Sequence, residues 1–469
     1  MSRLQLGTFL FLLSYLSSCG SLQSSRPSNT NHKYLKSQEA LDHRSQQGAI
    51  KLMKQVDDSW VRSKIFNGLE EITTILGFIN KSKKEELIEK KGYKEFFIET
   101  EEGSVTQALV KIPPTPRPFL IVTGGLASEV TMSAFTDYAI PIGEKYGLGI
   151  VLLEGNTSAN WTNRKGNQRM VLSGYEAGWE IYMTIKELHK IPEIASKMAE
   201  THLLGLSLGG SDVAYVSYFD SLDEEKRFID GATIGWNGPL LRHKDFRYTR
   251  EGDGPLSDLL REKIYIKHYD RIKSIIDRWM PGISKDDYVR NLDTDIYLKN
   301  IYFPQTKQYL KTHPHHYTKK VNGKFKLPFL FDAETFTYNQ YLRMVDVNDY
   351  LNHIENPLLW ISNEDDPLVP IESVREFLAD HNLPSHIAVL QNKQGGHLGE
   401  SSYRGKEWVY QTIMTQIVYW GQFTYPYYMQ FQNPEECNLM IHRPDPLKYK
   451  QKKSKPKKFI NICNIKPFE

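Results

Sequence analysis

Four short apolar segments, separated by helical patterns, constrain the fold of this chain more than any other feature. Each ends in glycine or polar residues, which is typical of parallel strands buried on both faces. The segments are PFLIVTGG at 118–125, LGIVLLEG at 148–155, THLLGLS at 201–207 and DGATIGWNGP at 230–239. Strands and helices that alternate with short connections predict an α/β protein, with a mostly parallel sheet and helices on both faces.

The same alternation extends on both sides of this region. Two alternating runs at 93–100 and 104–113 flank the turn-like Glu102-Gly103 and predict a β-hairpin. Further along the chain, apolar runs at 356–367 and 385–391 predict two more buried strands. Helical patterns accompany these strands at 129–146, 173–190, 208–219, 371–382 and 406–422.

An insertion separates the two parts of this pattern. Residues 240–345 are charged, rich in aromatic residues and helical in pattern, which predicts a largely helical cap or lid. Its aromatic side chains either line an apolar pocket or pack the cap itself; they are Trp279, Phe329, Phe331 and Phe336. The expected organisation is a signal peptide at 1–18, a tether at 19–48, core at 49–239 and 346–425 around the cap at 240–345, and a basic tail at 426–469.

A Gly-x-Ser-x-Gly motif lies between the third apolar segment and the following helix. The motif is Gly205-Leu206-Ser207-Leu208-Gly209. A nucleophile elbow needs a tight strand-to-helix turn with a strained serine, and glycines on either side leave room for that turn. Gly210 lets the helix pack close to the sheet. The motif predicts Ser207 as a nucleophile; the alternative is a glycine-rich packing turn with an inert serine.

A serine nucleophile needs a base, and the base needs an orienting acid. The loop NEDDPLVP at 363–370 places carboxylates at the carboxyl end of a strand, where such sites form. Asp366 is the preferred acid because it directly precedes the next helix, with Asp365 as the alternative. Either carboxylate could instead cap that helix. The loop GGHLG follows, and His397 is the expected general base and then general acid.

The oxyanion of an acyl-transfer reaction needs two backbone donors. One is expected to be the N–H of Leu208, directly after the nucleophile. The other is expected from Thr123-Gly124-Gly125-Leu126, with the N–H of Leu126 preferred. Backbone donors of this kind each contribute a few kcal/mol of transition-state stabilisation.

These elements occur in the order of the α/β-hydrolase superfamily, which the chain resembles between about 93 and 425. Three stretches are similar to the serine aminopeptidase-like and YheT-like hydrolases: GLSLGG at the elbow, the segment from Phe331-Asp332 through Tyr350 to the acid loop, and GGHLG. The resemblance implies an α/β-hydrolase fold and esterase-like or peptidase-like hydrolysis without a metal.

The amino terminus is expected to direct export and anchoring. Arg3 precedes an apolar run at 4–16 that is short for a membrane span, and Leu-Ser-Ser-Cys-Gly follows it. This sequence resembles a bacterial lipobox, which implies cleavage before Cys19 and lipid attachment to its thiol and amine. The alternative is an ordinary secretory signal. Residues 20–48 are polar and predict a flexible tether. The expected location is the bacterial cell envelope, in the outer membrane and periplasm or on the surface.

The carboxyl tail is rich in lysine and holds the other two of the 3 cysteines. A solvated tail is the simpler interpretation of the lysines, and contact with anionic headgroups is the alternative. In an oxidising compartment Cys437 and Cys463 could pair. The lysines are Lys448, Lys450, Lys452, Lys453, Lys455, Lys457 and Lys458.

Composition and charge exclude other classes. With 59 basic and 56 acidic residues the net charge is +3, too small to indicate nucleic-acid binding. His313, His315 and His316 form a small cluster for which a metal site is an alternative, but no nearby ligand spacing supports one, and a solvated polar loop is the simpler interpretation. We therefore expect a lipid-anchored serine hydrolase that cleaves a small-molecule acyl substrate without cofactor or metal. The alternatives are a peptidase or acyltransferase with the same triad, or a non-catalytic surface lipoprotein.

Overall fold

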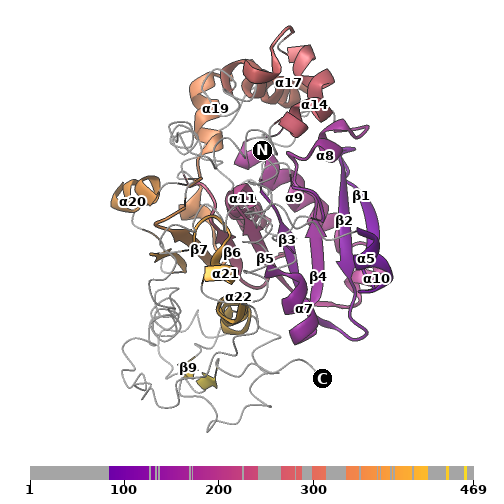
Figure 1. Ribbon diagram of the computed structural model, residues 1–469, viewed down its shortest axis with the longest axis vertical. Helices are drawn as coiled ribbons and strands as arrows, with labels where there is room; N and C mark the ends of the chain where they lie inside the picture. Colours follow the sequence, from indigo (N-terminus) through magenta and orange to yellow (C-terminus); the bar gives the residue numbers. More distant parts are fainter. Residues whose placement is uncertain are drawn as a thin grey trace, which may run out of the picture. The chain divides into compact units, whose positions relative to one another are not determined.

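Eight strands of the computed structural model form one sheet in the order β1-β2-β4-β3-β5-β6-β7-β8 (Figure 1). The strands are β1 (Lys94–Glu99), β2 (Val105–Lys111), β3 (Arg117–Thr123), β4 (Gly149–Leu153), β5 (Met198–Leu206), β6 (Thr233–Trp236), β7 (Leu358–Asn363) and β8 (Ile387–Asn392). They include every strand expected from the apolar and alternating segments of the sequence.

The structure describes much of the chain between residues 84 and 420 and two short segments beyond it. All described residues belong to one unit within residues 35–469. The described residues are 84–125, 128–131, 135, 138–167, 171, 173–223, 227–240, 266–279, 281–287, 298–312, 334–347, 350–366, 368–369, 371–380, 383, 386–393, 395–403, 406–420, 440–442 and 459–461.

Strand direction divides the sheet into a hairpin and a parallel part. β1 pairs antiparallel with β2, and β2 pairs antiparallel with β4. From β4 onward each neighbouring pair is parallel. This order and direction are those of the α/β-hydrolase fold, so the expected fold class is confirmed. Because Gly205 pairs with both Thr123 and Gly235, strands β3, β5 and β6 end at one level.

Alternating side chains of the central strands build a separate core on each face. In β3, Phe119 and Ile121 belong to one cluster of buried side chains, and Leu120 and Val122 belong to the other. Helices α9 (Gly174–Leu188), α11 (Leu208–Leu222) and α20 (Ile371–Asp380) pack on the first face. Helices α7 (Ile140–Tyr146) and α22 (Lys406–Trp420) pack on the second. The sheet is therefore covered on both faces, as its apolar strands require.

Other helices, most of them shorter, complete the described part of the chain. The helix expected at 129–146 is present as α7 from Ile140 onward, with a proline at its second position, and Phe135 and Tyr138 before it are also helical. The others are α5 (Lys84–Glu89), α8 (Ala159–Asn163), α10 (Pro192–Ala195), the 3-10 helix η4 (Leu351–His353) and α21 (Glu400–Tyr403). A small antiparallel pair, β9 (Met440–His442) and β10 (Phe459–Asn461), forms a second sheet in the tail.

The described part of the insertion at 240–345 is helical. It contains α14 (Ile266–Trp279), the π-helix η3 (Leu298–Tyr302), α17 (Phe303–Thr312) and α19 (Tyr338–Val345). Phe336 is buried against this region at 2% exposure, whereas Phe329 and Phe331 lie outside the described residues. The Thr306 hydroxyl of α17 donates to the Glu176 carboxylate of α9 at 2.6 Å, which ties the insertion to the core.

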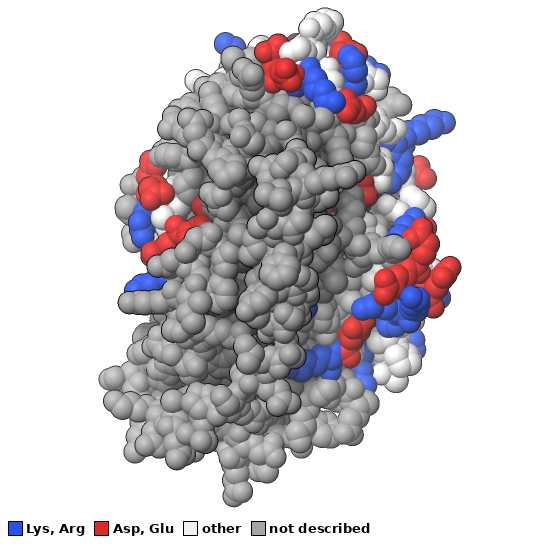
Figure 2. Space-filling view, viewed as in Figure 1, with Lys and Arg blue, Asp and Glu red and all other residues white. Residues whose placement is uncertain are grey.

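Charges of both signs lie side by side on the described surface around β1 (Figure 2). Lys94 and Glu193 form an ion pair at 2.5 Å, and Lys91 and Glu144 form one at 2.7 Å. Exposed pairs of this kind contribute roughly 0–1 kcal/mol each to stability, so the fold rests on the two apolar cores. Among the described helices, none has the length and apolar character needed to cross a membrane.

Candidate active site

The turn after β5 holds Ser207 in an unusual backbone conformation. Its φ is 58° and its ψ is −128°, a region that residues with a side chain rarely occupy. The surrounding bonds enforce it: the Ser207 N–H donates to the Trp236 carbonyl at 2.8 Å, and the Gly210 N–H donates to the Ser207 carbonyl at 2.7 Å. The strain points the Ser207 side chain out of the elbow, as a nucleophile requires.

Glycines allow the chain to approach itself this closely. A Cβ at Gly205 would overlap the Gly209 carbonyl oxygen, and a Cβ at Gly209 would lie 2.5 Å from the Gly124 oxygen. A Cβ at Gly210 would lie 2.9 Å from Cα of Gly238, at the end of β6. These three positions leave no room for a side chain, so close backbone packing by itself requires glycine at each of them.

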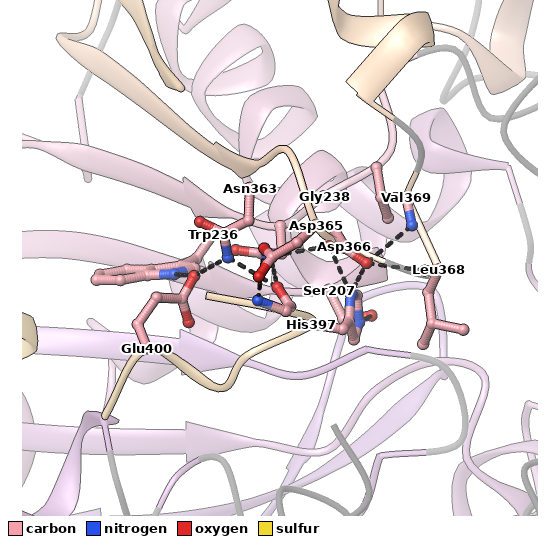
Figure 3. Close-up of polar contacts among 12 residues, drawn as sticks. Ser207, Trp236, Gly238, Asn363, Asp365, Asp366, Leu368, Val369, His397 and Glu400 are labelled. Atoms are coloured by element: carbon pink, nitrogen blue, oxygen red, sulfur yellow. Dashed lines mark hydrogen bonds and ion pairs between the residues drawn. The ribbon is translucent and has the colours of Figure 1, made fainter. Parts of the chain in front are cut away.

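The structure brings the side chains of Ser207, His397 and Asp366 into one line of hydrogen bonds (Figure 3). Nε2 of His397 lies 2.8 Å from Oγ of Ser207. Nδ1 of His397 lies 2.9 Å from Oδ2 of Asp366 and 3.1 Å from its Oδ1. The imidazole is 1% exposed, so these two neighbours set its orientation and tautomer. The arrangement can pass the hydroxyl proton of Ser207 to His397.

Adjacent carboxylates in the loop after β7 hold different partners. Asp366 accepts bonds from the backbone N–H groups of Leu368 (2.8 Å) and Val369 (3.0 Å), in addition to His397. Asp365 accepts bonds from the backbone N–H groups of Gly395 (3.1 Å) and Gly396 (2.8 Å). Asp366 therefore lies against the imidazole, whereas Asp365 fixes the backbone just before His397.

Asn237 is a site residue that the sequence reasoning did not identify. It directly follows β6 with φ of 51° and is fully buried. Its side-chain amide donates to Oδ2 of Asp366 at 2.8 Å and to the Gly396 carbonyl at 2.9 Å. Asn237 thus joins the acid loop to the histidine loop. The sequence signal was an asparagine before glycine at a strand end, a position where left-handed backbone is common.

Gly125 lies directly against the elbow. A Cβ at Gly125 would overlap the Ser207 side chain, at 2.7 Å from its Oγ, and would lie 3.3 Å from the backbone nitrogen of Leu208. The segment expected to supply an oxyanion donor therefore lies beside both the nucleophile and the Leu208 N–H, and only a glycine fits at this position. The other expected donor, Leu126, lies outside the described residues.

A buried glutamate lies beneath the histidine loop. Glu400 is fully buried and accepts hydrogen bonds from Tyr138, Trp236 (2.8 Å) and Asn363. Burial raises the pKa of the Glu400 carboxyl to about 7, although the three donors act in the opposite direction. The sequence motif gave no role to this residue.

Other expected sites fall partly or wholly outside the described residues. Within the described part of the chain, no group of three or more His, Cys, Asp or Glu side chains is arranged to hold a metal ion. The residues that lie outside it are Cys19, His313, His315, His316, Cys437 and Cys463.

Comparison with known proteins finds likeness only at the level of solved structures. No model of a protein family matches the chain, and no curated protein matches it. An esterase of Pyrococcus furiosus is 14% identical over 73% of this chain and 95% of its own, with a TM-score of 0.40. Est1E from Butyrivibrio proteoclasticus is 12% identical over 69% of this chain and 99% of its own, with a TM-score of 0.37.

A third solved structure is much longer than this chain. The acylaminoacyl peptidase of Pyrococcus horikoshii is 13% identical over 72% of this chain, with a TM-score of 0.40. The chain spans 44% of the length of that peptidase. The fold class rests on the strand order and direction of the sheet.

Proposed function

We propose that this protein is a serine hydrolase that cleaves a carboxylic ester through an acyl-enzyme. The observation that carries the proposal is the unbroken hydrogen-bonded line from Asp366 through His397 to Ser207, at an elbow where Ser207 has positive φ. An inert packing serine has no need of a buried imidazole and carboxylate aligned behind it.

The reaction begins with attack by Oγ of Ser207 on the acyl carbonyl carbon. Nε2 of His397 takes the hydroxyl proton as the new C–O bond forms, and the carbonyl π electrons move to its oxygen. The Leu208 N–H, directly after the nucleophile, donates to this oxygen as negative charge develops on it. Collapse of this intermediate expels the alcohol, which receives the proton from His397.

Water then releases the acyl group by the same route. His397 takes a proton from water, the hydroxide adds to the acyl carbon, and Ser207 leaves as the restored hydroxyl. Asp366, which lies against Nδ1 of His397, orients the imidazole and stabilises the imidazolium in both halves. The chain supplies every group these steps need, so the proposal includes no cofactor or metal.

An activity-based probe tests the proposal. A fluorophosphonate reporter is expected to label the wild-type protein and to leave Ser207→Ala unlabelled. Ser211→Ala is the matched control, because Ser211 lies one turn further along α11 and its hydroxyl donates to the Pro239 carbonyl at 2.8 Å. Labelling of Ser207→Ala at the wild-type rate would exclude Ser207 as the nucleophile.

Turnover then separates the reaction classes that share this triad. A panel of short p-nitrophenyl esters beside aminoacyl anilides is expected to favour the esters. Preferred cleavage of the anilides indicates a peptidase, and transfer to an added alcohol in place of hydrolysis indicates an acyltransferase. A folded protein that neither turns over substrates nor reacts with the probe would be a binding lipoprotein.

Export and lipid attachment form a separate part of the proposal. The apolar run at 4–16 followed by Leu-Ser-Ser-Cys-Gly supports cleavage before Cys19 and anchoring in the bacterial cell envelope. Metabolic labelling with an alkynyl fatty acid is expected to tag the wild-type protein in the membrane fraction. Cys19→Ser is expected to lose the tag and leave that fraction, and retention of the tag would contradict the proposal.

A further inference from the structure

Glu400 lies beneath the histidine loop, where the ends of β6 and β7 meet Tyr138. It begins α21, three residues after His397, and its carboxylate faces the ends of β6 and β7. The Trp236 indole N–H and the Asn363 amide donate to Oε1, and the Tyr138 hydroxyl donates to Oε2. Indole and amide N–H groups only donate, so the pocket is built to receive an acceptor.

The Asn363 amide connects Glu400 to the loop that holds His397. Its Nδ2 donates both to Glu400 and to the Gly396 carbonyl, the latter at 2.8 Å, while its Oδ1 accepts from Asn392 at 3.1 Å. Reversing the amide would place its oxygen against two acceptors, so Glu400 fixes its orientation. Gly395 also packs directly on Asn363, since a Cβ there would come within 2.5 Å of Nδ2.

We propose that Glu400 is a positioning residue for His397, which holds the histidine loop through the Asn363 amide and the Gly396 carbonyl, most firmly when its carboxylate is ionised (Figure 3). This inference rests on the proposed function, because its effect on rate assumes that His397 is the base. Asn237 completes the connection by bonding the same Gly396 carbonyl and Asp366.

The ionisation of Glu400 can switch within the physiological range. Charge-assisted hydrogen bonds are about twice as strong as neutral ones, so the anion holds Asn363 more firmly than the acid does. Burial opposes the anion and raises the pKa of the carboxyl to about 7. The titratable groups facing it or lying on the adjoining loops are Tyr138, Asp365, Asp366 and His397.

Glu400→Gln tests this inference, because glutamine has the shape of the neutral acid and keeps one acceptor oxygen. The ratio of wild-type to variant labelling rates with the fluorophosphonate is expected to be near one at pH 5.5. It is expected to rise to about fivefold at pH 8.5 as wild-type Glu400 ionises. A ratio that stays constant with pH would overturn the inference and leave Glu400 with a packing role only.

A second measurement reads Glu400 without any activity. In protein labelled with ¹⁵N-tryptophan, the Trp236 indole resonance, assigned by its loss in Trp236→Phe, is expected to shift with a midpoint near pH 7. The shift is expected to be absent in Glu400→Gln and to move to higher pH in Tyr138→Phe, which removes a donor that favours the anion. A Trp236 indole resonance that does not shift with pH would also overturn the inference.

The two readouts distinguish the inference from the function on which it rests. If the fluorophosphonate does not label the wild-type protein while the Trp236 indole resonance still shifts with pH, the proposed function fails. In that case the role of Glu400 in positioning a catalytic base fails with it. If the wild-type protein is labelled but the rate ratio is flat, only the inference about Glu400 fails.

Discussion

Gly125 lies directly against the side chain of Ser207, with no room for a methyl group between them. A Cβ at Gly125 would approach Oγ to 2.7 Å and Cβ of Ser207 to 2.6 Å. We predict that the methyl group of Gly125→Ala displaces the Ser207 side chain from its position beside His397 and lowers kcat/KM at least about 100-fold, an effect as large as the loss of an oxyanion donor. Steady-state ester hydrolysis measures the effect.

A glycine elsewhere in the chain provides the control for this change. Gly103, in the β1–β2 turn, has φ of 82°, and no heavy atom lies within 4 Å of the place that an alanine methyl group would take. Gly103→Ala is expected to cost about 1–2 kcal/mol of stability through backbone strain and to leave turnover intact. Wild-type turnover in Gly125→Ala would mean that catalysis does not depend on the close approach of Gly125 to Ser207.

The neighbouring carboxylates Asp365 and Asp366 should respond very differently to the same substitution. In Asp366→Asn the new amide donates to Nδ1 of His397, which forces the imidazole proton onto Nε2 and stops it from accepting the Ser207 proton. We predict a fall in kcat of three to four orders of magnitude, roughly the effect known for such tautomer changes.

Asp365→Asn should act through the loop backbone instead. Two N–H groups bond its two carboxylate oxygens, and asparagine leaves one of them without an acceptor. We expect a loss of about 1–3 kcal/mol of stability and a fall in kcat of at most about tenfold. Thermal unfolding and kcat, measured in parallel on both variants, check the pair. Equal losses of kcat would remove the distinction between the two carboxylates.

Most of the fold could be predicted from the sequence, because each central strand is recognisable from its own run of apolar residues. Segments such as 118–125 and 201–207 are apolar throughout, and they form β3 and β5 at the centre of the sheet. The order of the strands in the sheet follows from pairing between distant segments, which no single segment encodes.

Fewer features of the candidate site than of the fold could be predicted from the sequence. Ser207 and His397 stood out because glycines mark their loops. Asn237 and Glu400 also have a glycine neighbour but belong to no catalytic motif, and their roles arise only when β6, β7 and the histidine loop meet. Asp365 and Asp366 share one loop, so only side-chain direction separates their partners.

A buried hydrogen bond between α17 and α9 should hold the helical insertion against the core. Thr306 and Glu176 are each 2% exposed, and the threonine hydroxyl donates to the carboxylate at 2.6 Å. We predict that Thr306→Val removes a donor from a buried carboxylate and costs about 1–3 kcal/mol of stability. Thr306→Ser keeps the hydroxyl and should lose much less. Thermal unfolding of both variants checks this, and equal losses would indicate that packing of the methyl group is what matters.

Asp220 should make the fold less stable as pH rises. This buried carboxylate of α11 accepts bonds from the N–H groups of Phe228 (2.7 Å) and Ile229 (3.2 Å) and from the Asn356 amide (3.0 Å). Burial nevertheless raises its pKa from 3.8 to about 6. The folded state therefore holds this proton more tightly than the unfolded state does. The resulting stabilisation is complete below pH 3.8 and is lost as pH rises through about 6.

Asp220→Asn removes this titration while keeping one oxygen for the two backbone donors. Relative to wild type, the variant is expected to gain about 2 kcal/mol between pH 4 and pH 8. Chemical unfolding of both proteins at these two pH values measures the difference, and Ser217→Ala, one turn earlier on α11, controls for general loosening of the helix. A difference independent of pH would mean that Asp220 has the same affinity for its proton in the folded and unfolded chains.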